Sequence, residues 1–279
     1  MTDRAQIGNV EILAFVDIGP TTRPTNQVFP DVPSSEWDNY KNTLTDSGEL
    51  PFQMGFFALR SNGQTIVVDT GLGKGPHEAM GGITGQALEN LKKAGIRVED
   101  VNSVLITHLH GDHVGWNVTW EGNSSKPTFP NAKYYVPQGD WDYFNQKDVL
   151  ENSPHMKANV LPLQDAGVLE VIQDGFALTP EITTLGTPGH TPGHQSTLIN
   201  SGNQKAIVTG DAFHAVAQLQ ETDWNVGFDV DKPTAAKTRG SLMKRLEDEN
   251  FTIAAGHMVL GSNIGKIINV DGKRSWQVL

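Results

Sequence analysis

Short apolar runs alternate with Gly-, Pro- and Asn-rich turns along most of this chain. Runs rich in Val, Ile, Leu and Phe predict strands at residues 9–18, 52–59, 65–69, 103–106 and 132–136. Ser61-Asn62-Gly63 separates the second run from the third and predicts a hairpin turn. The pattern returns at residues 182–185, 206–209 and 251–255, and in a final hairpin at 267–273. The chain is therefore expected to be rich in short, buried strands.

Three stretches have the longer apolar period of helices. Helices are predicted at 84–94, which ends at Gly95, at 140–146, and at 233–249, which begins with a proline. Two other regions have no clear period. Residues 20–50 are predicted to form an extended arm, and residues 150–168 to be irregular because Pro154 and Pro162 interrupt them. We expect one α/β domain over residues 1–279, with this arm and an insertion at about 116–185.

Metal-capable side chains cluster directly after the strand predicted at 103–106. His108, His110, Asp112 and His113 lie within six residues, and imidazole and carboxylate groups suit zinc or a similar divalent ion. One tetrahedral ion would rarely take four ligands from so short a loop and keep an open position. The spacing therefore favours two ions, His108 and His110 facing one, Asp112 and His113 the other. The alternative is a solvated, histidine-rich loop.

Three further candidates stand in the same setting, each at the end of a predicted strand. His190 follows residues 182–185, Asp211 follows 206–209 and His257 follows 251–255. Asp211 could bridge two ions through its two oxygens, with His190 completing the first site and His257 the second. The sequence thus predicts seven ligands for two metals, with room for a shared water.

These residues resemble the metallo-β-lactamase superfamily, from about Phe56 to the C-terminus. Its pattern is His-x-His-x-Asp-His, then a lone His, a bridging Asp and a final His, which fall on the seven residues above. The resemblance implies an αββα four-layer sandwich with two zinc ions. It also implies that Asp69 orients a ligand imidazole rather than binding metal. His194 resembles a histidine that, like Asp69, supports a metal ligand without binding metal itself.

The composition of the chain restricts the kinds of molecule that it is expected to bind and the compartment in which it is expected to work. The net charge of −11 argues against nucleic acid, which basic surfaces bind, and no apolar run approaches the roughly 20 residues that span a bilayer. The N-terminus shows no signal-peptide pattern, so a cytoplasmic location is expected. The absence of cysteine excludes disulfides and thiolate ligands. A homodimer is left open.

Within the superfamily, the stretch 210–218 resembles the methyl parathion hydrolase and dihydrocoumarin hydrolase branch, near the quorum-quenching lactonases. Many of those lactonases carry a Tyr three residues after the bridging Asp, where this chain has His214. We expect His214 to contact substrate, with support of a metal ligand as the alternative. Trp116 and Phe213 lie within three residues of a ligand and are predicted to line the substrate pocket.

The resulting hypothesis is a dinuclear zinc hydrolase that opens lactones or cleaves related esters. The metals would activate a shared water for attack, with Asp112, Asp211 and His214 as the catalytic side chains. Two enzymatic alternatives use the same site or part of it, an aryl phosphotriester (organophosphate) hydrolase and a mononuclear iron persulfide dioxygenase. A non-enzymatic metal-binding role is the least favoured.

Overall fold

Two β-sheets form the centre of the computed structural model, which describes residues 3–279. The seven-stranded sheet has the order β1-β2-β3-β4-β5-β8-β9. Its strands are β1 Asp3–Ile7, β2 Val10–Arg23, β3 Leu50–Ser61, β4 Gln64–Val68, β5 Ser103–Leu105, β8 Lys133–Pro137 and β9 Leu169–Ile172. The six-stranded sheet consists, in order, of β10 Ile182–Gly186, β11 Gln195–Ser201, β12 Gln204–Val208, β13 Thr252–Ala254, β14 Ile264–Val270 and β15 Lys273–Val278.

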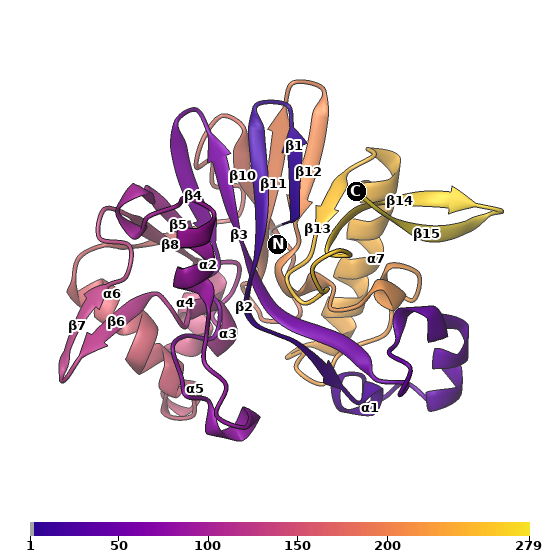
Figure 1. Cartoon of the computed structure of the whole chain (residues 1–279), viewed down its shortest axis with the longest axis horizontal. Coiled ribbons are helices and arrows are strands. Elements are labelled where there is room, and N and C mark those ends of the chain that lie inside the picture. The colour runs from indigo at the N-terminus through magenta and orange to yellow at the C-terminus, as the bar shows by residue number, and fades with distance from the viewer. Residues whose placement is uncertain (1–2) are drawn as a thin grey trace.

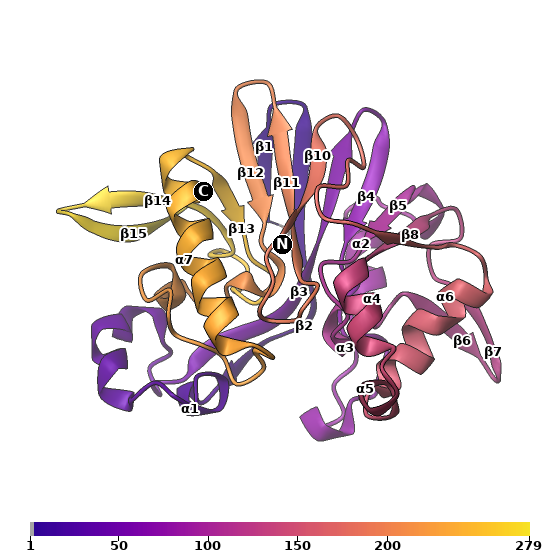
Figure 2. The ribbon, with the colours of Figure 1, turned by 180° about the vertical axis from the view of Figure 1, so that it is seen from behind.

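Helices cover the outer face of each sheet, so the molecule has four layers (Figures 1 and 2). Beside the first sheet lie α2 Ala87–Lys93, α3 Gly111–Val114, α4 Gln138–Phe144, α5 Lys147–Glu151 and α6 Leu161–Asp165. The long helix α7, Lys232–Asp248, packs on the second sheet. This arrangement confirms the predicted αββα sandwich.

The alternation of side chains along the strands explains the layers. In β2, Ile12 and Ala14 join the buried cluster between the two sheets, whereas Leu13 and Phe15 join the cluster under α2 and α4. Successive side chains of a strand point to opposite faces, so a run that is apolar on both faces needs cover on both sides. On the second sheet, Ile207 packs toward α7.

Most predicted elements occur where the sequence placed them. The hairpin across Asn62-Gly63, the helices α2, α4 and α7, and the last hairpin are confirmed, with ends shifted by a few residues. β1 was not predicted, and neither was the small β6–β7 sheet, which pairs Val118–Glu121 with Ser124–Pro127.

The prediction that residues 150–168 are irregular is wrong. They contain the end of α5, a π-helical turn at Met156–Val160 and α6. Pro162 stands in the first turn of α6, where a missing N–H removes no helical hydrogen bond. Much of the stretch predicted as an insertion also belongs to the main fold, because β8 and β9 are strands of the first sheet.

The predicted arm at 20–50 contains the end of β2, the short helix α1 at Thr25–Val28 and a 3₁₀ segment at Ser34–Thr43. An aromatic cluster joins the arm to the segment after Asp211, since Trp37 lies 5.0 Å and Tyr40 5.4 Å, centroid to centroid, from Trp224. Within residues 3–279, no helix has the length and apolarity needed to cross a membrane.

The topology brings several strand ends to one edge of the sandwich. β4, β5 and β8 are parallel to one another, as are β12 and β13, so within each sheet the loops after their carboxyl ends open at one edge, and the ligand contacts show that the two edges meet. Three of these loops carry candidate ligands, and the loop after β10 carries the fourth set. Ligands far apart in sequence can therefore converge at this edge.

Candidate metal centre

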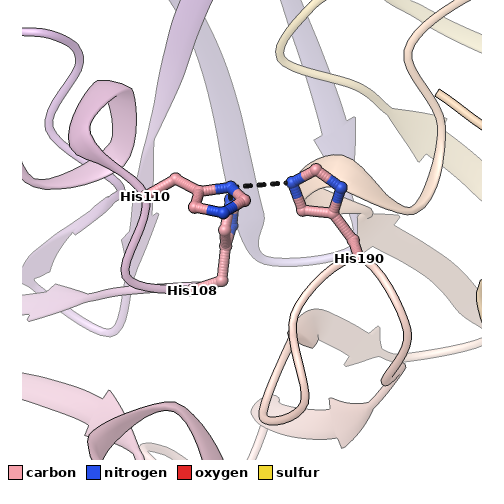
Figure 3. Close-up of side chains that lie close together, drawn as sticks. All are labelled: His108, His110 and His190. Carbon is pink, nitrogen blue, oxygen red and sulfur yellow. Dashed lines mark hydrogen bonds between the residues drawn. The ribbon is translucent and has the colours of Figure 1, made fainter. Parts of the chain in front are cut away.

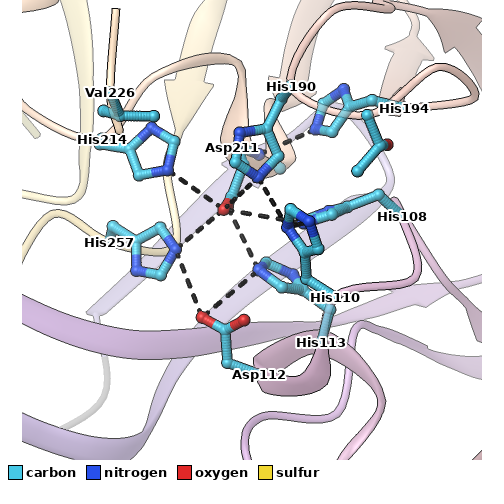
Figure 4. Close-up of polar contacts among 12 residues, drawn as sticks. His108, His110, Asp112, His113, His190, His194, Asp211, His214, Val226 and His257 are labelled. Atoms are coloured by element: carbon cyan, nitrogen blue, oxygen red, sulfur yellow. Dashed lines mark hydrogen bonds and ion pairs between the residues drawn. The ribbon is translucent and has the colours of Figure 1, made fainter. Parts of the chain in front are cut away.

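All seven predicted ligands meet at the edge of the sandwich (Figure 4). Their nitrogen and oxygen atoms form overlapping groups that could each hold a metal ion. The residues that make up these groups are His108, His110, Asp112, His113, His190, Asp211 and His257, together with His214, which forms one group with His190 and Asp211. The fold thus collects side chains from four separate loops.

One group consists of three imidazoles (Figure 3). His110 Nδ1 lies 3.1 Å from His108 Nε2 and 3.0 Å from His190 Nε2. His108 and His190 are almost completely buried. Three ring nitrogens that face one another, two of them on buried side chains, provide a donor set of the kind that holds zinc.

The second group pairs two imidazoles with a carboxylate. Asp112 Oδ2 lies 3.8 Å from His113 Nε2 and 3.7 Å from His257 Nε2. Asp211 stands between the two groups. Its Oδ1 is 3.3 Å from His113 Nε2, and its Oδ2 is 3.3 Å from His190 Nε2. This is the position required of a carboxylate that bridges two ions.

The polar atoms of the cluster fit two divalent metals. His113 Nε2 and Asp211 Oδ1 lie 3.3 Å apart but make no hydrogen bond with each other or with any other atom of residues 3–279. Buried polar atoms of this kind are costly unless something satisfies them. Burial alone would lower the pKa of His190, but hydrogen bonds to Asp211 and Asp229 raise it to about 9. The carboxylates thus favour positive charge at the site, which metal cations would supply.

Two supporting side chains lie where the sequence placed them. Asp69 Oδ2 is 2.8 Å from His113 Nδ1 and accepts from the Thr107 hydroxyl at 2.7 Å, while Asp69 Oδ1 accepts from Thr107 N. His194 Nε2 accepts a 2.9 Å hydrogen bond from the backbone N–H of Asp211. Both contacts constrain a ligand without using the face that would bind metal.

Two buried carboxylates of the site were missed by the sequence analysis. Asp140, in the first turn of α4, accepts hydrogen bonds from Leu109 N at 2.8 Å and Gly193 N at 2.7 Å, and so joins the two loops that carry His108, His110 and His190. Asp229 Oδ1 lies 2.9 Å from His190 Nδ1. Asp140 follows a predicted strand, a weak signal that could have found it. Nothing in the sequence around Asp229 distinguishes it from a surface loop residue.

The structure corrects the prediction that Trp116 and Phe213 line the substrate pocket. Trp116 belongs to the core beneath α2, where its indole N–H donates a 2.8 Å hydrogen bond to Asp17. Phe213 is fully buried and packs with the side chains under α7. A short sequence distance from a ligand did not put either side chain in the cavity, because both pack in core clusters instead.

A cavity of about 590 Å³ opens onto the cluster. Its polar floor includes His110, Asp112, Asp211, His214 and His257, and its remaining lining residues are Arg23, Gln27, Val28, Phe52, Met54, Leu72, Gly111, His190 and Phe228. The arm contributes Gln27 and Val28 from α1. The apolar residues of the wall thus come from the arm, β3 and two loops rather than from the segments next to the ligands in sequence.

His214 lines this cavity, as the substrate-contact hypothesis requires. Its Nε2 lies 3.2 Å from Asp211 Oδ2, and its ring stacks on His257 with centroids 4.9 Å apart. Burial lowers the pKa of His214 to about 4, so the ring is neutral near pH 7.

Replacing Gly189 with alanine is expected to destabilise the protein by about 3 kcal/mol or more. Gly189 precedes His190 at φ +130°, and a Cβ there would lie 2.2 Å from Ala235 N of α7. Thermal or urea unfolding measures the loss. Gly202→Ala is the matched control, because Gly202 also has a positive φ but nothing lies near its Cβ position. Equal losses in the two variants would contradict the clash.

Comparison with known proteins agrees with the geometry. The metallo-beta-lactamase superfamily profile matches residues 56–257, and the chain therefore belongs to that superfamily. An N-acyl homoserine lactonase from a Bacillus species is 27% identical over 207 residues, which are 67% of this chain and 75% of the relative. The N-acyl homoserine lactonase AttM of Rhizobium radiobacter is 25% identical, covering 78% of this chain and 87% of the relative.

Two solved structures share the whole architecture. The hydrolase AbOPH matches with a TM-score of 0.85 and 25% identity, over 100% of this chain and 97% of its own. AidC, a dizinc quorum-quenching lactonase solved with a product, matches with a TM-score of 0.80 and 22% identity, over the same shares. At this identity, the likeness to AidC shows the fold alone. The homologues and neighbours of this chain are thus metal-dependent lactonases and hydrolases.

Proposed function

We propose that this protein is a dinuclear zinc hydrolase that opens lactones or cleaves related carboxylic esters. The observation that carries the proposal is Asp211, which stands between two groups of ligand atoms at the floor of a cavity. The lactonase relatives support the same reaction class. AidC, the dizinc lactonase whose structure resembles this chain, supports zinc as the metal.

His108, His110 and His190 would hold the first ion, Asp112, His113 and His257 the second, and Asp211 would bridge them. When bound, two zinc ions would lower the pKa of a water and polarise the substrate carbonyl. Asp112 lies at the cavity floor, where its carboxylate can accept the proton that this water loses. In this scheme the Nε2–H of His214, which faces Asp211 Oδ2 at 3.2 Å, would donate a hydrogen bond to a carbonyl or released alkoxide bound beside that carboxylate.

The lining of the cavity favours a substrate that is mostly apolar and has a few hydrogen-bond acceptors. Val28, Phe52, Met54, Leu72 and Phe228 provide apolar surface beside the metal cluster. Such a wall suits an acyl chain or an aryl group better than a sugar or a nucleotide, whose polar groups would lose their hydration without replacement. This is the chemistry of acyl lactones and aryl esters.

Metal removal combined with a substrate panel tests the proposal. We expect close to two equivalents of zinc per chain, and loss of lactone hydrolysis on chelation with recovery on adding zinc back. The panel compares an acyl homoserine lactone, dihydrocoumarin and an aryl phosphotriester by kcat/KM, and oxygen consumption with a persulfide substrate is measured in parallel.

The outcomes separate the alternatives. Faster turnover of the phosphotriester than of every lactone and ester would make the protein an organophosphate hydrolase on the same site. A single iron with oxygen consumption would indicate a persulfide dioxygenase. Less than one equivalent of any transition metal, with activity that survives chelation, would exclude the proposed site altogether.

A further inference from the structure

Arg239 is a fully buried guanidinium on α7, close to the metal cluster but outside it. Its side chain is 1% exposed, and burying such a charge is costly unless it is paired and hydrogen-bonded. Its Nη1 lies 3.2 Å from Asp229 Oδ2, its Nη2 donates to Asn225 Oδ1 at 2.5 Å, and its Nε donates to Thr222 O at 2.9 Å. All three nitrogens thus hold the loop that precedes α7.

Asp229 connects this guanidinium to a metal ligand. Oδ2 accepts from Arg239 and from the backbone N–H of Val226 at 3.2 Å, while Oδ1 faces His190 Nδ1 at 2.9 Å. The Asp229 side chain is completely buried. Both oxygens are therefore occupied, and the carboxylate cannot turn away from the imidazole without losing contacts to Arg239.

The contact with Asp229 determines how His190 presents its other nitrogen. An ionised carboxylate only accepts hydrogen bonds, so Nδ1 must carry the proton, which leaves the lone pair on Nε2. Nε2 is the atom that faces His110 Nδ1 and Asp211 Oδ2 in the cluster. Asp69 makes the equivalent contact with His113, on the side of the second metal position.

We propose that Arg239 and Asp229 form a positioning pair that sets the affinity of the first metal site through His190. The inference rests on the proposed dinuclear centre. Because Arg239 and Asp229 reach the cluster through His190, their loss should weaken the first site and leave the second, supported by Asp69, close to its normal affinity. Neither residue contacts substrate in this scheme.

Asp229→Asn and Arg239→Met test the pair by metal binding, without an activity assay. Zinc affinity is measured by competition with a chromophoric chelator, and ¹¹³Cd NMR reports each site as a separate signal. We expect first-site affinity to fall about 10- to 100-fold in both variants, the usual range for losing such a partner of a ligand histidine. The signal of the second site should persist.

Asp17→Asn is the matched control for the loss of a buried carboxylate. Asp17 is fully buried and accepts hydrogen bonds from Leu72 N, Gly73 N, Ala87 N and the Trp116 indole, none of which belongs to a ligand. We expect this variant to lose stability but to keep both metal affinities. Circular dichroism checks that each protein is folded.

If Arg239→Met does not fold, Arg239→Lys replaces it in the test. The lysine keeps the buried positive charge but cannot make all three hydrogen bonds of the guanidinium, to Thr222, Asn225 and Asp229. We expect an intermediate loss at the first site. Unchanged affinities in folded Asp229→Asn and Arg239→Lys, or equal losses at both sites, would overturn the inference. Failure of the wild-type protein to bind two metals would instead overturn the proposed function, so the two failures are distinguishable.

Discussion

Asp211→Ala is expected to lower kcat/KM for the preferred lactone by more than about 100-fold, because in the proposed centre this one carboxylate would bridge both metals. Asp211 Oδ2 lies 3.0 Å from His257 Nε2 and 3.3 Å from His190 Nε2, while Oδ1 faces His113 Nε2. Removing it leaves these imidazoles without their shared anion. Steady-state kinetics and metal analysis of the same preparation measure the effect.

Asp211→Asn separates charge from volume. This variant keeps the size of the side chain but provides one neutral oxygen in place of the carboxylate. We therefore expect it to bind less than the full amount of metal and to have a kcat/KM below that of the wild-type protein. Wild-type protein stripped by a chelator is the reference for complete metal loss. Near-normal turnover of Asp211→Ala at full metal occupancy would rule out the bridging role.

His214→Ala is expected to lower kcat by about 100-fold at full metal content, the typical loss for one hydrogen-bond donor in a transition state. His214 lines the cavity with its Nε2 3.2 Å from Asp211 Oδ2, so a carbonyl bound beside Asp211 comes within reach of the ring. KM should change less than kcat, because the hydrogen bond strengthens as charge develops on the oxygen.

His214→Gln provides the matched variant, since its amide N–H can replace the imidazole donor. We expect it to recover part of the lost kcat. Metal content is measured alongside, because a fall in metal content with unchanged kcat per bound metal pair would assign His214 to the support of a ligand. If neither quantity changed for any accepted lactone or ester, His214 would have no role in the site.

The candidate site was largely visible in the sequence because its ligands follow apolar runs. A buried strand ends where the chain leaves the core, and a His or Asp shortly after that point lies at the sheet edge, as His108, Asp211 and His257 do. The two-sheet architecture was expected from the resemblance to the metallo-β-lactamase superfamily, and the apolar runs are consistent with it. Runs that are apolar at successive positions, such as 12–15, need cover on both faces.

The direction of side chains between those strand ends was decided only by tertiary packing. Trp116 and Phe213 are close to ligands in sequence, yet each joins a core cluster because burying an aromatic ring under a helix removes its apolar surface from water. Local spacing does not encode that choice, which depends on helices from distant parts of the chain.

The sequence by itself determined the strand ends and the seven candidate ligands, because apolar periodicity and local spacing express them directly, whereas the sandwich was expected from the resemblance of these motifs to the metallo-β-lactamase superfamily. Only the tertiary structure showed the apolar cavity walled partly by the arm, and the buried carboxylates Asp140 and Asp229. Asp229 meets His190 across 39 residues, and Arg239 reaches Asp229 from α7. Such contacts depend on how loops pack after the sheets have formed, and no local pattern of hydrophobic and polar residues records them.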